Sequence, residues 1–345
     1  MGRQRLEKKI KEGGSYFDIP STDLEFIPAG CKLLDLVLGG GWAEGRIINI
    51  VGDKSSGKTL MCIEASANFA VKYPRGLIFY REAEAAFLKS YAETLGMPLD
   101  RVDFGEDKVF DTVEYVFEDM ETCVARCMKK KVPGLYILDS LDALSDVAEL
   151  KRDMDEPSYG TDKARKMSQF FRRLVRKMEQ AQITVIIVSQ VRSKIGPTFG
   201  RTTTRSGGRA LDFYASQVLY LAHLNTVTRI VKGIKRPVGV HIKAKCDKNK
   251  VALPYRECMF DILFAYGIAD LSASVDWLRE VKALGSVGLK RKGIRSFLKA
   301  CNKLSDADYR KELIRINEAV QKKWYSIEKT FLPTRRKYRS SEEGN

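Results

Sequence analysis

Residues 52–59 form a short stretch rich in glycine, serine and lysine, between an apolar run at 47–51 and a helical pattern at 60–71. A strand, a glycine-containing turn and a helix in this order are what a phosphate-binding P-loop requires. The glycines let backbone N–H groups turn inward around phosphate oxygens, and the start of the helix adds a favourable dipole. In such a loop Lys58 reaches the β- and γ-phosphates and the Thr59 hydroxyl holds Mg²⁺. The stretch therefore predicts a nucleotide site built from Gly52, Asp53, Lys54, Ser55, Ser56, Gly57, Lys58 and Thr59.

Apolar runs and helical patterns alternate beyond this stretch. The runs at 76–80, 135–139 and 184–189 have the composition of buried strands. Helical spacing of apolar residues is found at 85–96, 113–127 and 167–178. Alternation of this kind predicts an α/β fold whose mostly parallel central sheet is covered by helices on both faces. Because ligands of such sheets bind at the carboxyl ends of the strands, the residues that follow each run are candidate site residues.

Three polar residues follow the predicted strands. Asp139 stands where a carboxylate holds Mg²⁺ in P-loop enzymes, and its alternative role is a helix N-cap. Glu84 could activate the attacking water, although Glu82 and Asp142 fit the local spacing equally well. Gln190 could sense the γ-phosphate or serve as an ordinary turn residue. A long segment, 191–208, follows it directly.

The charge of the chain favours a polyanionic partner. Sixty Lys and Arg residues stand against 44 Asp and Glu, which gives a net charge of +16, and nucleic acid is the first candidate. The segment 191–208 has no apolar periodicity and reads as a long loop, with cations in and just after it and two apolar residues among them: Arg192, Lys194, Ile195, Phe199, Arg201, Arg205 and Arg209. Cations match backbone phosphates and an apolar side chain can wedge between bases, whereas the alternative is a solvated loop.

Cysteine usage and hydropathy indicate the compartment. The seven cysteines are odd in number and scattered, mostly in apolar stretches, which favours a reducing environment. No stretch is long and apolar enough to span a bilayer, and the basic N-terminus lacks the apolar region of a signal peptide. We therefore expect a cytoplasmic protein without a membrane partner.

Taken together, these segments resemble the RecA family of DNA strand-exchange recombinases, from about Asp23 to Ile268. The matching segments are 33–41, 45–47, the P-loop, 83–84, 138–140, 189–196, 199–200, 207–208, 213–216, 248–250 and Pro254. Hexameric helicases share the P-loop core but are not expected to match both the long loop and the lysines at 248–250. The resemblance implies a RecA-like P-loop NTPase core that uses ATP and Mg²⁺.

The resemblance also assigns roles at the nucleotide. It makes Glu84 the catalytic carboxylate, acting with Lys58 and Gln190. Further nucleotide contacts are expected from Asp139 and Ser140 at the metal, and from Tyr91 and Phe264 at the adenine. Lys248 and Lys250 are expected to reach the nucleotide of the adjacent subunit. Leu88 replaces an acidic residue that contacts adenine, and Lys54 stands where bacterial members usually have glutamate.

DNA contacts are implied at two loops, 153–161 and 191–208. The expected DNA-binding residues are Arg165, Arg192, Lys194, Ile195, Phe199, Arg201, Arg205, Gly207 and Gly208, with Ile195 as a wedge between base triplets. A charged helix at 3–12 has too few apolar residues for a core of its own, and the resemblance implies that it docks on a neighbouring subunit. Self-assembly into a helical filament is therefore expected.

The predicted domains are an N-terminal oligomerisation segment (1–26), an ATPase core (27–270), a small basic helical domain (271–333) and a disordered tail (334–345). Residues 271–345 hold 18 Lys and Arg against 9 Asp and Glu, a net charge of +9. This basic end differs from the acidic tail of many bacterial members, so regulation by an acidic tail is not expected.

The predicted function is that of an ATP-dependent recombinase in DNA recombination and repair. It forms filaments on single-stranded DNA and catalyses homologous pairing and strand exchange with duplex DNA. A single-strand-binding protein and a loading mediator are the expected helpers, in the cytoplasm at the nucleoid or, for a viral member, in the host cytoplasm. The alternatives are a ring-shaped DNA helicase or translocase and a non-hydrolysing recombination mediator.

Overall fold

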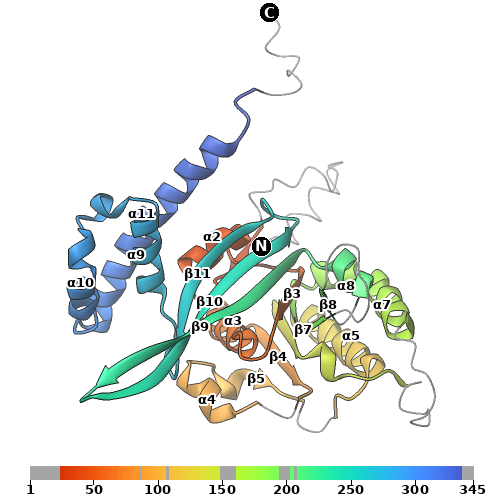
Figure 1. Cartoon of the computed structure of the whole chain (residues 1–345). Helices are drawn as coiled ribbons and strands as arrows, with labels where there is room; N and C mark the ends of the chain where they lie inside the picture. The colour runs from red at the N-terminus through yellow and green to blue at the C-terminus, as the bar shows by residue number, and fades with distance from the viewer. Residues whose placement is uncertain are drawn as a thin grey trace, which may run out of the picture. The chain divides into compact units, whose positions relative to one another are not determined.

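The computed structural model describes residues 24–84, 87–105, 109–147, 161–193, 203–205 and 208–335 (Figure 1). The chain divides into two compact units, the first ending at Ala269 and the second beginning at Asp270. The predicted oligomerisation helix at 3–12 and residues 336–345 of the predicted tail lie outside the described ranges. In the part of the chain that is described, no helix has the length and apolar character needed to cross a membrane.

The first unit contains helices and strands in alternation. Its strands are β1 (Phe26–Ile27), β2 (Trp42–Ala43), β3 (Ile47–Gly52), β4 (Leu77–Glu82), β5 (Val102–Asp103), β6 (Gly134–Asp139), β7 (Ile183–Ser193), β8 (Thr203–Arg205), β9 (Gln217–Val231), β10 (Ile234–Asn249), β11 (Arg256–Leu263) and β12 (Gly267–Ile268). Its α-helices are α2 (Lys32–Leu38), α3 (Lys58–Lys72), α4 (Lys89–Thr94), α5 (Val113–Lys130), α7 (Thr161–Gln180) and α8 (Gly208–Tyr214), and 3₁₀ turns occur at Leu99–Arg101 and Leu141–Ala143.

One large sheet organises the first unit. Among the described residues its strand order is β12-β11-β10-β9-β3-β7-β6-β4-β5, and β8 pairs with β7. The six strands from β9 to β5 run parallel, while β10, β11, β12 and β8 pair in the antiparallel sense. The predicted mostly parallel central sheet is confirmed. β1 and β2 form a separate small sheet.

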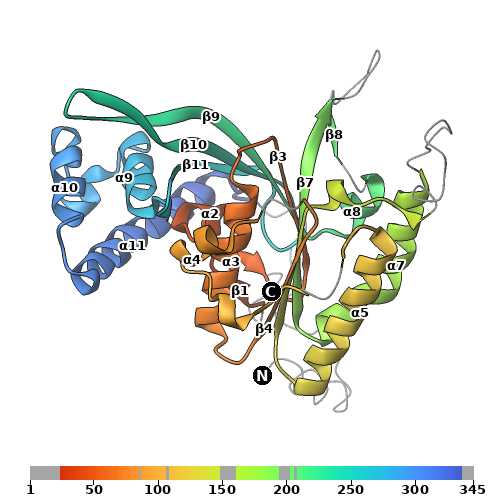
Figure 2. The same cartoon turned by 90° about the horizontal axis from the view of Figure 1, so that it is seen from below.

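The central parallel strands, such as β3 and β6, are buried on both faces, which explains their nearly continuous apolar composition. Every residue of β3 and β6 is buried. Figure 2 shows α5 and α7 on one side of these strands and α3 on the other. Alternate strand residues, among them Val51, Phe79 and Tyr136, join the core cluster under α5 and α7. The intervening residues, such as Tyr80, face α3. The two faces of β4 therefore have different neighbours, α5 and α7 on one face and α3 on the other.

Three elements differ from the sequence-based expectation. The helix predicted at 85–96 is regular only in α4, and the chain turns at Gly96 with a φ of +89°. The segment predicted as a loop, 191–208, begins as a continuation of β7 and contains β8. The hairpin of β9 and β10 is much longer than the strands predicted for it. Its outer half is exposed and lacks the apolar alternation of a strand packed against a core, so the pattern does not predict that half.

The second unit is helical, as its apolar spacing predicts. It contains α9 (Asp270–Glu280), α10 (Ile294–Cys301) and α11 (Asp306–Phe331), with 3₁₀ turns at Leu284–Val287 and Arg291–Gly293. Leu278 of α9 and Ile316 of α11 are buried, and the rings of Trp277 and Trp324 lie 5.7 Å apart between their centroids. The Ser305 hydroxyl accepts the N–H of Asp308 at 3.2 Å and so caps the start of α11.

Candidate nucleotide site

The loop at 52–59 joins the end of β3 to the start of α3, as the P-loop pattern requires. Two of its glycines leave no room for a side chain. A Cβ on Gly52 would stand 2.4 Å from the Ser56 hydroxyl oxygen, and one on Gly57, whose φ is +88°, would stand 2.4 Å from Ile262 Cδ1. Ser56 is fully buried and donates a hydrogen bond of 2.8 Å to the carbonyl oxygen of Asp53. The loop is therefore held in one tight turn above the sheet.

Lys58 opens α3 and bends back over the loop. Its Nζ donates a hydrogen bond of 2.7 Å to the carbonyl oxygen of Asp53. Burial lowers the pKa of Lys58 below its ordinary value, and the carboxylates of Asp139, Glu84 and Asp142 oppose that effect. The Lys58 ammonium is therefore surrounded by carboxylates. An anionic ligand that brings its own cation would fit such a site.

Asp139 ends β6 and points toward the start of α3. Its Oδ2 accepts the hydroxyl of Thr59 and the hydroxyl of Tyr80, each at 2.8 Å. Its side chain is buried, and burial raises the pKa of Asp139 while these two hydrogen bonds oppose the rise. Ser140 holds the N-cap position of the 3₁₀ turn that follows, without a capping hydrogen bond from its side chain, so Asp139 is not the N-cap. Hydroxyl and carboxylate oxygens are the ligands that Mg²⁺ prefers, and Thr59 with Asp139 fits that ion.

Glu84 joins two other strand ends through its side chain. Its Oε1 accepts hydrogen bonds from the Ser140 hydroxyl and, at 3.1 Å, from Nε2 of Gln190. Glu82 and Asp142 instead accept backbone N–H groups, those of Glu84 at 2.9 Å and Gln190 at 2.6 Å. The sheet register puts Glu82 level with Asp139, and Gly52 level with Gln190. The predicted strand-end residues therefore meet at one edge of the sheet.

The residues expected at the adenine lie on two neighbouring elements. Tyr91 is on α4, and Phe264 is in the turn between β11 and β12; both side chains are exposed. A Cβ on Gly267, at the start of β12, would stand 3.8 Å from Leu95 Cδ2, just after α4. Leu88 precedes α4 and is 69% exposed.

Lys248 and Lys250 lie at the opposite edge of the sheet from the P-loop. The Lys250 N–H donates to the Ser216 carbonyl, and the Ser216 N–H donates to the carbonyl of Ile47, the first residue of β3. Both ammonium groups contact α8: Lys248 reaches the carbonyl oxygens of Asp212 and Phe213, and Lys250 reaches that of Phe213 at 3.0 Å. Within a single chain, Lys248 and Lys250 therefore do not reach the P-loop.

The expected DNA-binding residues fall partly outside the described chain. Lys194, Ile195, Phe199, Arg201 and Gly207 lie there, as does most of the first expected loop. Arg192 and Arg205 are on β7 and β8, which pair through Arg192 with Thr204 and through Val191 with Arg205. Gly208 is the first residue of α8, and Arg165 is exposed on α7. β7 thus runs without a break from Gln190 into the second loop.

Sequence analysis missed one contributor to the site, Tyr80. It lies inside an apolar run and is fully buried, so it looks like a core residue. Its hydroxyl nevertheless contacts Asp139. The available signal was chemical, because a buried tyrosine hydroxyl requires a hydrogen-bond partner.

A P-loop follows a central parallel strand, and a Thr–Asp pair and a Glu–Gln pair lie at the same sheet edge. This arrangement defines a P-loop nucleoside triphosphatase (NTPase) of the α/β class. Residues 5–269 match the family model described as the RecA N-terminal domain. The chain therefore belongs to the RecA family.

Curated relatives agree over most of the chain. Protein RecA of Trichodesmium erythraeum is 34% identical over 290 residues, which cover 84% of this chain and 75% of that protein. Protein RecA of Nostoc punctiforme is 37% identical over 263 residues, covering 76% and 69%. Protein RecA of Thermosynechococcus vestitus is 36% identical over 271 residues, covering 79% and 72%.

The expected family, recombinase function and DNA-dependent ATPase activity are confirmed by this membership. Membership also implies nucleotide binding, DNA binding and self-assembly. Neither a ring-shaped helicase nor a non-hydrolysing mediator is favoured.

Proposed function

We propose that the chain polymerises on single-stranded DNA with bound ATP and Mg²⁺, pairs that strand with homologous duplex and exchanges the strands. The observation that carries the proposal is the meeting of four strand ends. Thr59 lies just after the P-loop that ends β3, Asp139 ends β6, Glu84 follows β4 and Gln190 lies in β7, level with the end of β3; these residues contact one another in pairs. The last of these strands continues directly into the expected DNA loop.

The nucleotide binds in the P-loop turn. Backbone N–H groups of 52–57 and the start of α3 face its phosphates, and Lys58 exchanges its bond to Asp53 for phosphate oxygens. Thr59 and Asp139 hold the Mg²⁺, which supplies charge neutralisation of the phosphates. Tyr91 and Phe264 flank the adenine, and the apolar Leu88 offers no charge for recognising the base.

Glu84 acts as the general base on water. The Ser140 hydroxyl fixes its Oε1, and the amide of Gln190 contacts the same oxygen. Glu82 and Asp142 are the weaker candidates, because each accepts a backbone N–H at the sheet edge, Glu82 that of Glu84 and Asp142 that of Gln190 in β7. In this role Glu84 accepts a proton from the water that attacks the γ-phosphorus, while the bond from that phosphorus to the β–γ bridging oxygen breaks and ADP leaves.

Gln190 reports the state of the nucleotide to DNA. A γ-phosphate offers the Gln190 amide a new acceptor in place of Glu84. Since β7 continues to Ser193 and is paired with β8, a shift of Gln190 moves the ends of the second DNA loop. Arg165, Arg192, Lys194, Arg201 and Arg205 supply cations to phosphates there, with Gly207 and Gly208 at the end of the loop, and Ile195 and Phe199 supply apolar contacts to bases.

Lys248 and Lys250 complete the site of a neighbouring subunit. Lys250 is level with the first residue of β3, whereas the P-loop follows its sixth. At about 3.3 Å per strand residue this separation is roughly 16 Å, beyond the reach of a lysine side chain. A role at ATP therefore requires the site of a second chain, as in a filament.

Electron microscopy of the full chain with single-stranded DNA and a non-hydrolysable ATP analogue tests the proposal. We expect helical filaments that need both the analogue and the DNA, and none from Lys58→Ala, which lacks the phosphate-binding lysine. Closed rings on DNA would contradict the proposal in favour of a helicase. Particles without assembly, from protein shown to bind both ligands, would contradict it as well.

A further inference from the structure

The carboxylate of Glu64, in the second turn of α3, is seated between two glycines. A Cβ on Gly30, just before α2, would stand 2.8 Å from Oε2 of Glu64, and a Cβ on Gly267, at the start of β12, would stand 2.4 Å from Oε1. Both glycines have a positive φ, +87° and +100°, which glycine adopts without the strain that a side chain brings. Two distant parts of the chain therefore leave room for this one carboxylate.

Glu64 also holds the backbone of β12. Its Oε1 accepts the N–H of Ile268 at 3.3 Å. Ile268 is paired with Ile262 of β11. Ile262 in turn lies against the P-loop, since a Cβ on Gly57 would stand 2.4 Å from its Cδ1. Glu64 thus ties a strand beside the P-loop to the helix that begins in it.

Both aromatic residues proposed to flank the adenine are attached to the same junction. Phe264 is in the turn that joins β11 to β12 and is exposed. Tyr91 is on α4, which is followed by Leu95, and Leu95 Cδ2 would stand 3.8 Å from a Cβ on Gly267. Gly267 is therefore the point at which the Glu64 carboxylate, the turn and the end of α4 meet.

The turn depends on such an anchor because its own strand ladder is short. β11 and β12 share two residue pairs, Ile262 with Ile268 and Leu263 with Gly267. A carboxylate is a stronger acceptor for a backbone N–H than a neutral group. One side-chain bond to β12 therefore has a large effect on where the turn lies relative to α3.

We propose that Glu64 is a positioning residue for the base of the nucleotide. Its carboxylate fixes the turn of Phe264 and the end of α4 relative to the helix that binds the phosphates, and so sets the width of the adenine site. The proposal rests on the proposed function, which places the adenine between Tyr91 and Phe264. Loss of the Glu64 carboxylate should therefore weaken the binding of the base and spare the binding of the phosphates.

Calorimetric titration of the full chain with two ligands separates these effects. One is a non-hydrolysable ATP analogue with Mg²⁺, and the other is tripolyphosphate with Mg²⁺, which offers the phosphates without the base. Glu64→Ala should weaken the analogue about tenfold, because loss of a bond to a charged acceptor lets the turn leave its binding position. Tripolyphosphate should bind as it does to the wild type.

Two milder substitutions keep the test independent of folding. Glu64→Asp retains the charge but is too short to reach β12, so it should show the same preference for loss of the analogue. Glu64→Gln retains an acceptor and should bind both ligands within about threefold of the wild type, since a neutral acceptor makes a weaker bond. Asn68→Ala, one turn further along α3, removes a bond of 2.9 Å to the Glu64 carbonyl oxygen and is the matched control. It should bind both ligands as the wild type does, and thermal unfolding verifies the fold of each variant.

Equal loss of both ligands in Glu64→Ala, or loss of neither, would overturn the proposal. Tyr91→Ala and Phe264→Ala distinguish its failure from that of the proposed function. If these variants weaken the analogue alone while Glu64→Ala does not, the adenine site stands and the role of Glu64 is wrong. If neither aromatic variant weakens the analogue, the placement of the adenine is wrong and the role of Glu64 is rejected with it.

Discussion

The hydroxyl of Tyr80 donates a hydrogen bond of 2.8 Å to Oδ2 of Asp139. The same oxygen accepts the hydroxyl of Thr59, so two donors from two elements fix one carboxylate. A carboxylate held in this way needs little reordering to receive a metal ion, which is the usual effect of such an outer partner.

Tyr80→Phe should weaken Mg²⁺-dependent nucleotide binding. The substitution removes one hydrogen bond to a charged group, a loss of about 1.5 kcal/mol, or about tenfold in the Mg²⁺ affinity. Titration of Mg²⁺ against a fluorescent ATP analogue measures it. Tyr136→Phe removes a buried hydroxyl on the other face of the sheet, at Asp119, and is the matched control. An unchanged Mg²⁺ dependence in Tyr80→Phe would show that Thr59 alone suffices.

Glu84→Gln should retain ATP and DNA binding but lose DNA-stimulated turnover by about two or more orders of magnitude, the usual effect of a lost general base. Glutamine keeps an oxygen for the Ser140 hydroxyl, so the local structure is preserved. Steady-state hydrolysis with single-stranded DNA is the measurement, and Glu82→Gln is the control. A wild-type rate in Glu84→Gln would transfer the role to Glu82 or Asp142.

Lys248→Ala with Lys250→Ala should abolish ATP hydrolysis, and mixing this variant with Lys58→Ala should restore part of it. The expected reason is that one interface in a mixed assembly joins an intact P-loop to intact lysines. Activity is measured over a series of mixing ratios, with each variant alone as the control. If no ratio gives more activity than the separate variants, the lysines do not act across subunits.

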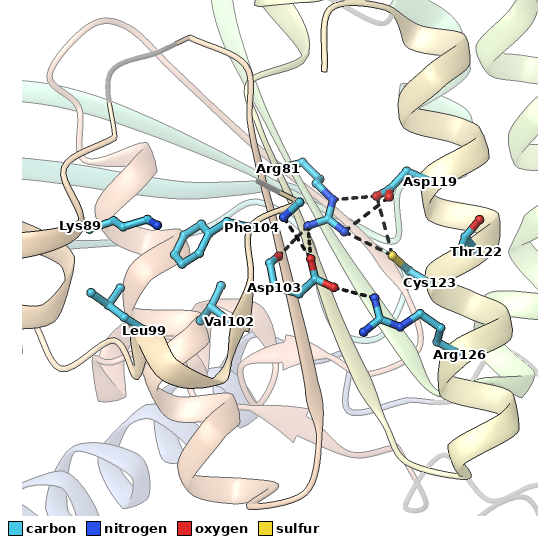
Figure 3. Close-up of a pocket in the computed structure, with 11 residues that line it drawn as sticks. Arg81, Lys89, Leu99, Val102, Asp103, Phe104, Asp119, Thr122, Cys123 and Arg126 are labelled. Atoms are coloured by element: carbon cyan, nitrogen blue, oxygen red, sulfur yellow. Dashed lines mark hydrogen bonds and ion pairs between the residues drawn. The ribbon is translucent and has the colours of Figure 1, made fainter. Parts of the chain in front are cut away.

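Arg81→Met should destabilise the first unit by about 3–5 kcal/mol, because it leaves the buried Asp119 carboxylate without its charged partner (Figure 3). Arg81 and Asp119 are each 1% exposed in their side chains. The double variant Arg81→Met, Asp119→Leu should recover much of the loss, since both charges are then gone. Urea unfolding measures the free energy, and Arg173→Met, which breaks a largely exposed pair with Glu121, should cost about 0–1 kcal/mol. A loss in Arg81→Met no larger than this would rule out a stabilising pair.

Ending the chain at Ala269 should leave single-strand-stimulated ATP hydrolysis largely intact but weaken duplex capture. The removed residues, 270–345, hold 18 Lys and Arg against 10 Asp and Glu, a net charge of +8. Fewer cations release fewer counterions, so the salt dependence of duplex binding becomes shallower. Binding is measured over a salt series with both proteins shown to be folded. Equal affinity and equal salt slope would assign this unit a role other than duplex binding.

The strand-end residues could be predicted because parallel strands end at one level. Glu82 is level with Asp139 and Gly52 with Gln190, so proximity in space follows from position after an apolar run. Spacing alone could not choose among Glu84, Glu82 and Asp142. That choice depends on which carboxylate meets a side chain and which meets a backbone N–H, and only the folded chain contains this information.

Residues that satisfy two requirements at once were harder to predict. The ring of Tyr80 packs in the core, and its hydroxyl donates to Asp139 in the site. An apolar sequence pattern indicates only the buried ring. Arg81 directly follows the same run, and its partners Asp103 and Asp119 come from separate elements with no local signature. The outer half of the β9–β10 hairpin pairs only with itself, so no buried face imposes an apolar alternation on it.

Lys248 and Lys250 already have acceptors in their own chain, the carbonyl oxygens at the end of α8. If these lysines serve a neighbour, the neighbour competes with those carbonyls for them. A triphosphate competes for a lysine ammonium far more strongly than a peptide carbonyl does. A diphosphate competes less strongly than a triphosphate. The contact between successive subunits would then weaken as each γ-phosphate is released. A filament would therefore come apart first where its nucleotides have been bound longest.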